Sequence, residues 1–392
     1  MPQRKKQLMK ISDISIAVMG SAWRNLTFLK LTTDEGLTGI SEVRLSNRTN
    51  ALLGYLEECK KRYILGTDPF RIEHTVRRMF RDDYGRVGEI CASAVSLVEV
   101  ACWDIVGKAA NLPVYVLLGG AVREKIKAYA NAWYQVPRTP DDFGCAAKAA
   151  VAKGYRALKF DPFGAGYYEM ERRDRIHCVS LVEAVRAAVG PDVELLIEMH
   201  GRFSPATAIR ISRDLEPFEP TWVEEPVPAD NIKALAKAAR HIRIPVATGE
   251  RLHHKQEFRE LFERQACDII QPDITECCGL LEVKKIAAMA DMYYITVAPH
   301  NVGGPVSTAT ALHLAACTTN FKIQEHFNDF TEPHTRECAN GCPKVVDGHF
   351  SLPAGPGLGV TLNEDVIKAH PPMWGHFSLF VEDWQKRQAE QR

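Results

Sequence analysis

The sequence has no excess of charge of either sign, because its 392 residues include 49 lysines and arginines against 49 aspartates and glutamates. This balance argues against a nucleic acid or an anionic membrane as partner, and we interpret the basic run at residues 4–6 as a solvated tail. Runs of about 18 consecutive apolar residues are absent, as is an apolar signal core near the N-terminus. We therefore expect a soluble, cytoplasmic protein.

Cysteine pairs with the C-x-x-C spacing of a structural zinc site are also lacking, although the chain has 11 cysteines. Several of them, such as Cys91, Cys102 and Cys317, lie in apolar helical patterns, where a free thiol behaves as a small hydrophobic group. We expect these thiols to be reduced. A content of 46% hydrophobic and 25% charged residues is typical of a globular protein with room for a barrel and a smaller domain.

Residues 1–122 have the pattern of a small α+β domain. Alternating apolar residues between Lys10 and Val43 are interrupted by Asp34-Glu35-Gly36, which predicts a hairpin turn within an antiparallel sheet. Helical spacing of apolar residues follows at 50–63, 71–80 and 89–111.

Residues 123–354 alternate between short apolar strands and helical patterns. Parallel strands need helical crossovers, so eight such alternations favour a (β/α)8-type barrel. The expected strands are 127–130, 157–160, 195–199, 222–225, 246–249, 268–271, 295–298 and 321–324. The segment 355–392 begins rich in glycine and proline and is expected to return to the N-terminal domain.

Three successive barrel strands end in a carboxylate at equal spacing. Glu198, Glu224 and Glu250 are separated by 26 residues each, which is the length of one strand, one helix and two loops. The same point on consecutive units is therefore marked, and these points meet at one mouth of a barrel. Because three carboxylates alone would repel one another, the pattern indicates a divalent metal on oxygen ligands. Glu225 points to the other side of its strand and is expected to brace this site.

Further polar residues reach the same mouth. Alternation along a strand places Lys159 and Asp161 on one face, and it likewise pairs Glu198 with His200. The other polar residues at strand ends are Asp273, His300 and Glu325. Enzymes with this architecture carry out their chemistry at this face.

These motifs resemble the enolase superfamily, mandelate racemase subgroup, over nearly the whole chain. The resemblance is carried by the evenly spaced carboxylates and by VEEP at 223–226, ATGERL at 247–252, DIIQPD at 268–273, VAPHN at 297–301 and GPGLG at 355–359. Within the subgroup, EMHGR at 198–202 is similar to sugar-acid dehydratases of the galactonate and mannonate type.

The resemblance implies a modified (β/α)7β TIM barrel with an N-terminal α+β capping domain. It implies one Mg²⁺ per chain on Glu198, Glu224 and Glu250, in agreement with the preference of Mg²⁺ for oxygen ligands. It also implies a lyase that abstracts the proton α to the carboxylate of an aldonic or aldaric acid. Enolate stabilisation at the metal and loss of water would then give a 2-keto-3-deoxy sugar acid.

The same resemblance assigns roles to the remaining residues. His300 is the base and Asp273 orients its imidazole, while His200 is the acid that expels the β-hydroxyl. Glu325, if protonated, would donate a hydrogen bond to the enolate oxygen. Substrate contacts are expected from Asp161, Arg202, Trp23, Asn131, Trp133, Tyr134 and Asn301.

The role of Lys159 stays open at this point. It could bind the substrate carboxylate, act as an acid or base from the opposite face, or only form an ion pair with Asp161 or a metal ligand. In this subgroup Asp is more usual than Glu198, and racemases carry a second lysine where Asp161 stands, so a racemase or epimerase is disfavoured.

Two alternatives to dehydration remain from the sequence. A cycloisomerase of a sugar acid, anhydro sugar acid or lactone fits the same scaffold, and a non-catalytic protein that binds acid sugars is the other option. Because relatives of this type are often homo-oligomers, we also expect this chain to form one.

Overall fold

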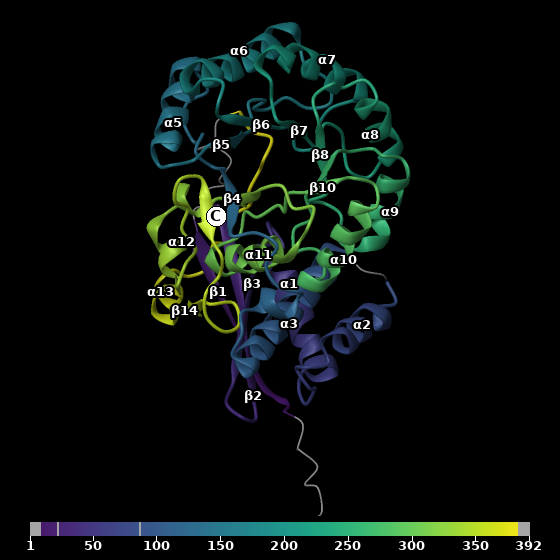
Figure 1. Ribbon diagram of the computed structural model, residues 1–392, viewed down its shortest axis with the longest axis vertical. Coiled ribbons are helices and arrows are strands. Elements are labelled where there is room, and N and C mark those ends of the chain that lie inside the picture. The colour runs from purple at the N-terminus through teal and green to yellow at the C-terminus, as the bar shows by residue number, and fades with distance from the viewer. Residues whose placement is uncertain (1–8, 22, 86–87, 383–392) are drawn as a thin grey trace, which may run out of the picture.

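The computed structural model describes residues 9–21, 23–85 and 88–382, so the basic run at 4–6 lies outside the described residues. The chain forms an α+β capping unit, built mostly from its N-terminal part, and a barrel surrounded by helices (Figure 1). The strands of the barrel all run in one direction, whereas those of the capping sheet are antiparallel.

The capping unit consists of a three-stranded sheet in the order β1-β2-β3 and the helices packed on it. Its strands are β1 (Ile11–Ser21), β2 (Arg24–Thr33) and β3 (Thr38–Val43), and its helices are α1 (Thr49–Cys59), α2 (Ile72–Asp82), α3 (Glu89–Ala110) and α4 (Val114–Leu117). Gly36, in the predicted hairpin turn, has a φ of 83°, a region that glycine enters without steric cost. The hairpin is therefore confirmed. The predicted helix 50–63 is α-helical only to Cys59 and continues as a π-helical turn over Lys60–Ile64.

Helix α3 is the central helix of the capping unit. Among the helices of the described residues, it alone is long and apolar enough to cross a membrane. However, 83% of its most apolar window is buried inside the fold, as in the core helix of a globular domain.

Eight parallel strands form the barrel, and seven helices lie between them in the chain (Figure 1). The strands are β4 (Lys125–Ala130), β5 (Ala157–Phe160), β6 (Glu194–Glu198), β7 (Trp222–Glu224), β8 (Val246–Thr248), β9 (Ile269–Ile270), β10 (Thr296–Val297) and β11 (Gln324–His326). The helices are α5 (Pro140–Ala152), α6 (Arg172–Val189), α7 (Pro205–Leu215), α8 (Ile232–Ala239), α9 (Lys255–Glu263), α10 (Leu280–Asp291) and α11 (Pro305–Cys317). From β4 to β10 each strand pairs with the next, and β11 pairs with β4. The predicted (β/α)7β barrel is confirmed.

The last barrel strand begins three residues later than predicted, at Gln324. Different residues of this part of the chain contact the two neighbouring strands. Phe321 forms a parallel bridge to Val297 of β10, whereas Gln324, Glu325 and His326 pair with β4. The predicted strand 321–324 begins at the bridge to β10, and Glu325 lies in the part that pairs with β4.

One apolar side chain from each strand, or from the residue next to it, fills the interior of the barrel. This layer consists of Tyr129, Ala157, Leu196, Trp222, Ala247, Ile269, Ala298 and Ile323. All eight are buried, and the rings of Tyr129 and Trp222 pack edge to face with centroids 5.6 Å apart. The interior is therefore a packed core that supports the polar residues at the mouth.

The C-terminal segment contacts the capping unit. The Leu358 amide donates to Asp104 Oδ1 of α3 at 2.9 Å, and the Gly20 amide donates to the His370 carbonyl at 3.1 Å. The remaining elements are α12 (Pro333–Glu337), β12 (Ala339–Asn340), β13 (His349–Ser351), β14 (Thr361–Leu362) and α13 (Glu364–Ala369). The domain boundaries at residues 122 and 354 stay predictions.

Close packing of β3 on α3 makes Gly39 sensitive to substitution. A Cβ at Gly39 would lie 2.0 Å from the Ala101 carbonyl oxygen and 2.7 Å from Ile105 Cγ1, so Gly39→Ala must push the helix from the sheet. We expect the free energy of unfolding to fall by at least about 1–3 kcal/mol in urea titrations. Gly54→Ala is the matched control, since none of the described residues would come within 4 Å of that Cβ. It should gain about 0.5–1 kcal/mol as a helix-interior alanine, and equal effects would contradict the packing argument.

Candidate active site

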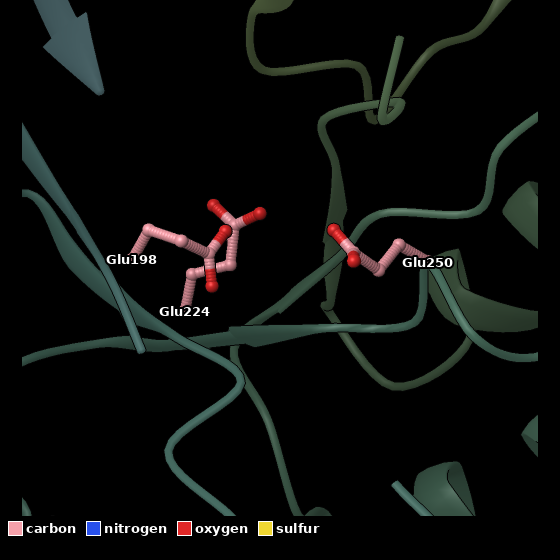
Figure 2. Close-up of side chains that lie close together, drawn as sticks. All are labelled: Glu198, Glu224 and Glu250. Carbon is pink, nitrogen blue, oxygen red and sulfur yellow. The ribbon is translucent and has the colours of Figure 1, made fainter. Parts of the chain in front are cut away.

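The three evenly spaced glutamates meet at the C-terminal mouth of the barrel. Glu198 ends β6, Glu224 ends β7 beside it in parallel register, and Glu250 follows β8. One carboxylate oxygen from each lies within 4.8 Å of the others, and Figure 2 shows the three side chains converging on one space. The first two are buried, and Glu250 is only 13% exposed.

The electrostatics of this trio suit a bound cation. Burial and the neighbouring Glu224 raise the pKa of Glu198 well above its ordinary value, and Glu198 Oε2 accepts no hydrogen bond from the described residues. Burial acts most strongly on Glu224 and would raise its pKa, but Lys159, Glu198 and Gln271 together lower this pKa. At Glu250 burial likewise acts to raise the pKa of the carboxyl, but His300, Arg251 and Lys159 together lower it. An all-oxygen donor set in which one buried oxygen accepts no hydrogen bond from the described residues is suited to a hard divalent cation.

Lys159 lies among these carboxylates, and Asp161 is not its partner. Its Nζ is 2.5 Å from Glu224 Oε1, 3.1 Å from Glu325 Oε1 and 3.3 Å from Glu198 Oε2. Burial opposes the charge of the ammonium, but these carboxylates outweigh burial and raise the pKa of Lys159 well above its ordinary value. The side chain is therefore held as a cation. Of the interpretations left open by the sequence, this geometry matches an ion pair with the glutamates.

His300 and Asp273 form the predicted pair across two loops. His300 Nδ1 is 2.8 Å from Asp273 Oδ2, while its Nε2 lies 3.5 Å from Glu250 Oε2. The other Asp273 oxygen accepts from the amide and hydroxyl of Thr275 at 2.8 and 2.7 Å. In the neutral ring, an N–H at Nδ1 donates to the carboxylate and leaves the lone pair of Nε2 toward the mouth. Burial disfavours the imidazolium, but Glu250, Glu325 and Asp273 outweigh it and raise the pKa of this histidine to about 10.

His200 is held on the other side of the trio. Its Nδ1 lies 2.9 Å from Asp161 Oδ2, and its backbone amide donates to Glu198 Oε1 at 2.6 Å. Arg202 also donates to Asp161 Oδ2, as well as to the Gly164 carbonyl at 2.8 Å. Burial lowers the pKa of His200, and the contact with Asp161 opposes that shift. His200 has a φ of 48°, a strained conformation of the kind found at functional sites.

Glu325 is surrounded by N–H donors. Asn131 Nδ2 donates to its Oε1 and the Asn301 amide to its Oε2, both at 2.7 Å. Together with the Lys159 ammonium, these groups make both oxygens acceptors. The contacts do not support the expectation that a protonated Glu325 donates to an enolate.

Glu225 is linked to the trio through Arg251. The Arg251 Nε lies 3.0 Å from Glu225 Oε2 and 3.6 Å from Glu250 Oε1, so one guanidinium contacts both carboxylates. This arrangement agrees with the expectation that Glu225 braces the site. Like His200, Glu225 has a positive φ, of 41°.

A cavity of about 730 Å³ opens over these groups. Its walls come from the barrel mouth, from the capping unit and from the C-terminal segment. The predicted residues that line it are Trp23, Asn131, Tyr134, Lys159, His200, Glu250 and His300. Residues that the sequence analysis did not assign include Arg44, Asn47, Arg251, His253, Glu276, Phe327, His376, Phe377 and Leu379. Arg251 follows Glu250 directly and could have been found from that position, but the C-terminal residues carry no motif.

Four expected substrate contacts are instead used within the protein. Trp133 packs in the core against Phe160, with centroids 5.3 Å apart, and its Nε1 donates to the Lys159 carbonyl at 2.8 Å. Arg202 and Asp161 are buried against each other beneath His200. Asn301 is buried as well, and its side chain donates to Thr308 Oγ1 at 2.9 Å. These residues shape the site from behind its surface.

Comparison with known proteins places both parts of the chain in one family. Residues 4–119 match the mandelate racemase/muconate lactonizing enzyme N-terminal domain, and residues 143–366 match the enolase C-terminal domain-like family. The chain is 34% identical to a D-galactonate dehydratase of Ralstonia pickettii, over 96% of this chain and 100% of that protein. It is 36% identical to a D-gluconate/D-galactonate dehydratase of Picrophilus torridus, over 89% of each.

A solved structure gives the same result. A mandelate racemase/muconate lactonizing enzyme-like protein from Roseovarius sp. TM1035 superposes with a TM-score of 0.86 at 36% identity, over 92% of this chain and 95% of that one. The chain belongs to the mandelate racemase/muconate lactonizing enzyme family of the enolase superfamily.

Proposed function

We propose that the protein is a Mg²⁺-dependent dehydratase of an aldonic or aldaric sugar acid. One observation carries this proposal: a metal-ligand trio lies between two histidines, each with a carboxylate partner, at one cavity. The names of the relatives, dehydratases of galactonate and gluconate, support the same reaction class. We further propose a cytoplasmic homo-oligomer whose partner is a small acid sugar, with neither nucleic acid nor membrane involved.

Glu198, Glu224 and Glu250 would hold the one Mg²⁺ of each chain. When bound, the ion supplies positive charge against the charge that develops on the substrate carboxylate as its α-proton is removed. Lys159, fixed beside the ligands, adds a second positive charge at the floor of the same space. Because Lys159 is held as an ammonium, it is a poor candidate for the second base that a racemase needs.

His300 is the base in this proposal. Asp273 holds its Nδ1–H, which directs Nε2 to the cavity, where it can accept the α-proton. Neutralisation of the Glu250 charge would bring the pKa of His300 down from about 10, toward the range in which an imidazole is a base at neutral pH.

His200 is the acid that gives a proton to the departing β-hydroxyl. It lines the cavity from the β6 side, while His300 enters it from β10. Asp161 stabilises the protonated form of His200 and is itself neutralised by Arg202, which keeps the pair in place. The two histidines therefore divide proton removal and proton delivery between two sides of the site.

A panel of sugar acids incubated with the enzyme and Mg²⁺ tests the reaction class. We expect at least one acyclic aldonic or aldaric acid to give a 2-keto acid, detected as its semicarbazone. Turnover of lactones or anhydro sugar acids alone would establish the cycloisomerase alternative and overturn dehydration. Binding of sugar acids without turnover would establish the non-catalytic alternative.

Substitution of the two histidines should separate the two half-reactions. In ²H₂O, His300→Asn should lose exchange of the substrate α-proton by about 10²–10⁴-fold, because the base is gone. His200→Asn should keep this exchange and lose formation of the keto acid by a similar factor. NMR of the recovered substrate measures exchange.

The contrast between these variants decides the assignments. Retained exchange in His300→Asn would remove this residue as the base, and near-normal elimination in His200→Asn would remove that residue as the acid. Circular dichroism of both variants controls for loss of the fold.

Glu224→Gln tests the metal site directly. It removes one anionic ligand and the closest partner of Lys159, so we expect isothermal titration calorimetry to show at least tenfold weaker Mg²⁺ binding. Glu194→Gln, a part-exposed carboxylate at the other end of β6, is the control and should bind Mg²⁺ like the parent. Unchanged affinity of the Glu224 variant would exclude this glutamate as a ligand.

A further inference from the structure

The two loops that carry Asp273 and His300 lead into helices α10 and α11, and both helices begin at a glycine. Gly279 is the N-cap residue of α10, and Gly304 is that of α11. A glycine has no side chain to accept the free N–H groups of the first turn. Other helices of the same ring use their own N-cap side chains, namely α5 with Thr139, α7 with Ser204 and α8 with Asn231.

Glu42 of β3 supplies the missing acceptor at α11. Its Oε1 accepts from the Gly304 amide, and its Oε2 accepts from the Val306 and Ser307 amides at 3.0 and 3.4 Å. The carboxylate is buried, with only 3% of Glu42 exposed. A residue of the capping unit thus holds the first turn of a barrel helix, four residues after His300.

Glu99 of α3 does the same at α10. Its Oε2 accepts from the Leu280 amide at 2.9 Å and its Oε1 from the Leu281 amide at 3.0 Å. One turn earlier on α3, the Ser96 hydroxyl shares its proton between the carbonyl of Ala92 at 2.9 Å and that of Ile274 at 3.0 Å. Ile274 is the residue next to Asp273, so the capping unit holds this loop at both of its ends.

The glycines make room for these carboxylates. A Cβ at Gly304 would lie 2.9 Å from both oxygens of Glu42, and a Cβ at Gly279 would lie 2.3 Å from Glu99 Oε2. Gly279 also has a φ of 98°, which disfavours other residues. Both contacts therefore depend on a glycine and a glutamate that are far apart in the chain.

We propose that Glu42 and Glu99 are positioning residues, through which the capping unit sets the geometry of the His300–Asp273 pair. The inference rests on the proposed function, in which His300 is the base. The hydrogen bond between the pair joins two separate loops, so it requires both loops to be placed correctly. A displacement of about 1 Å at a reacting group can cost about 10²-fold in rate.

Asp104 provides a matched control from the same unit. It is a buried carboxylate of α3 that accepts from the Ile40 and Leu358 amides at 3.0 and 2.9 Å. Here too a glycine makes room, since a Cβ at Gly357 would lie 2.1 Å from Asp104 Oδ1. These contacts fasten the C-terminal segment and β3 to α3, and they reach neither loop of the histidine–aspartate pair.

The experiment compares Glu42→Gln, Glu99→Gln and Asp104→Asn in the full-length chain. Each change replaces an accepting oxygen by an NH₂ group that cannot accept, so at least one buried amide loses its partner. Hydrogen exchange of the protein alone, read by mass spectrometry, should become faster at 300–307 in Glu42→Gln and at 274–281 in Glu99→Gln. Asp104→Asn should leave both segments unchanged.

Kinetics with a sugar acid that the enzyme turns over should likewise separate the two glutamate variants from Asp104→Asn. We expect kcat and α-proton exchange to fall about tenfold or more in the two glutamate variants, with KM and Mg²⁺ affinity within twofold of the parent. The proposed metal ligands lie at the ends of β6, β7 and β8, and none of them belongs to either fastened loop. Asp104→Asn should lose thermal stability but keep kcat.

Gly304→Ala is a second test if Glu42→Gln does not fold. It displaces the Glu42 carboxylate without altering it and should reproduce the faster exchange at 300–307. If kcat fell in proportion to the loss of thermal stability in all three carboxylate variants, Asp104→Asn included, the contacts would only stabilise the fold. Unchanged exchange at the two loops would also overturn the proposal.

The proposed function and this inference can fail separately. If the parent protein turns over no sugar acid, dehydration fails, while the exchange measurements on the protein alone still decide whether the glutamates hold the loops. If dehydration is found but the exchange pattern is absent, only the positioning role is lost.

Discussion

The mutual repulsion of three buried carboxylates is the constraint on which the rest of the site depends. Glu198, Glu224 and Glu250 place oxygens within 4.8 Å of one another at the mouth of the barrel. Lys159 and Arg251 offset part of this charge, but Glu198 Oε2 still lacks a hydrogen bond among the described residues. Every other polar group at the mouth is arranged around this excess of negative charge, which is the condition for tight binding of a divalent cation.

The same negative field explains why each histidine is paired. An imidazole near carboxylates gains a proton easily, and its orientation has to be fixed by its other nitrogen. Asp273 fixes His300 and Asp161 fixes His200, both through Nδ1. The two pairs differ in support: Asp161 also contacts the guanidinium of Arg202, whereas Asp273 also accepts hydrogen bonds from the amide and hydroxyl of Thr275. This difference agrees with the opposite duties of acid and base that we propose.

Much of the fold was predictable because its signals are periodic and local. The barrel strands follow from apolar alternation, and the metal trio follows from a spacing of 26 residues. Contacts between distant residues were not predictable in this way. The partners of Lys159, the acceptors Glu42 and Glu99, and the cavity wall at His376, Phe377 and Leu379 all depend on how two units pack. Trp133 was misassigned for the same reason, since an aromatic residue after a strand fits a cavity wall and a core equally well.

The C-terminal segment, which forms one wall of the cavity, is held in place although its sequence carries no motif. Asn25 exchanges two hydrogen bonds with the backbone of Met373, at 2.7 and 2.8 Å, and Asn47 does the same with Phe377, at 3.0 and 2.9 Å. Both amides bind main-chain atoms, so they hold the segment whatever side chains it carries. The Phe377 ring then packs on Trp23, with centroids 4.6 Å apart, and Leu379 faces the cavity. The groups proposed for chemistry thus lie on strand ends, while this wall can change its side chains without losing its attachment.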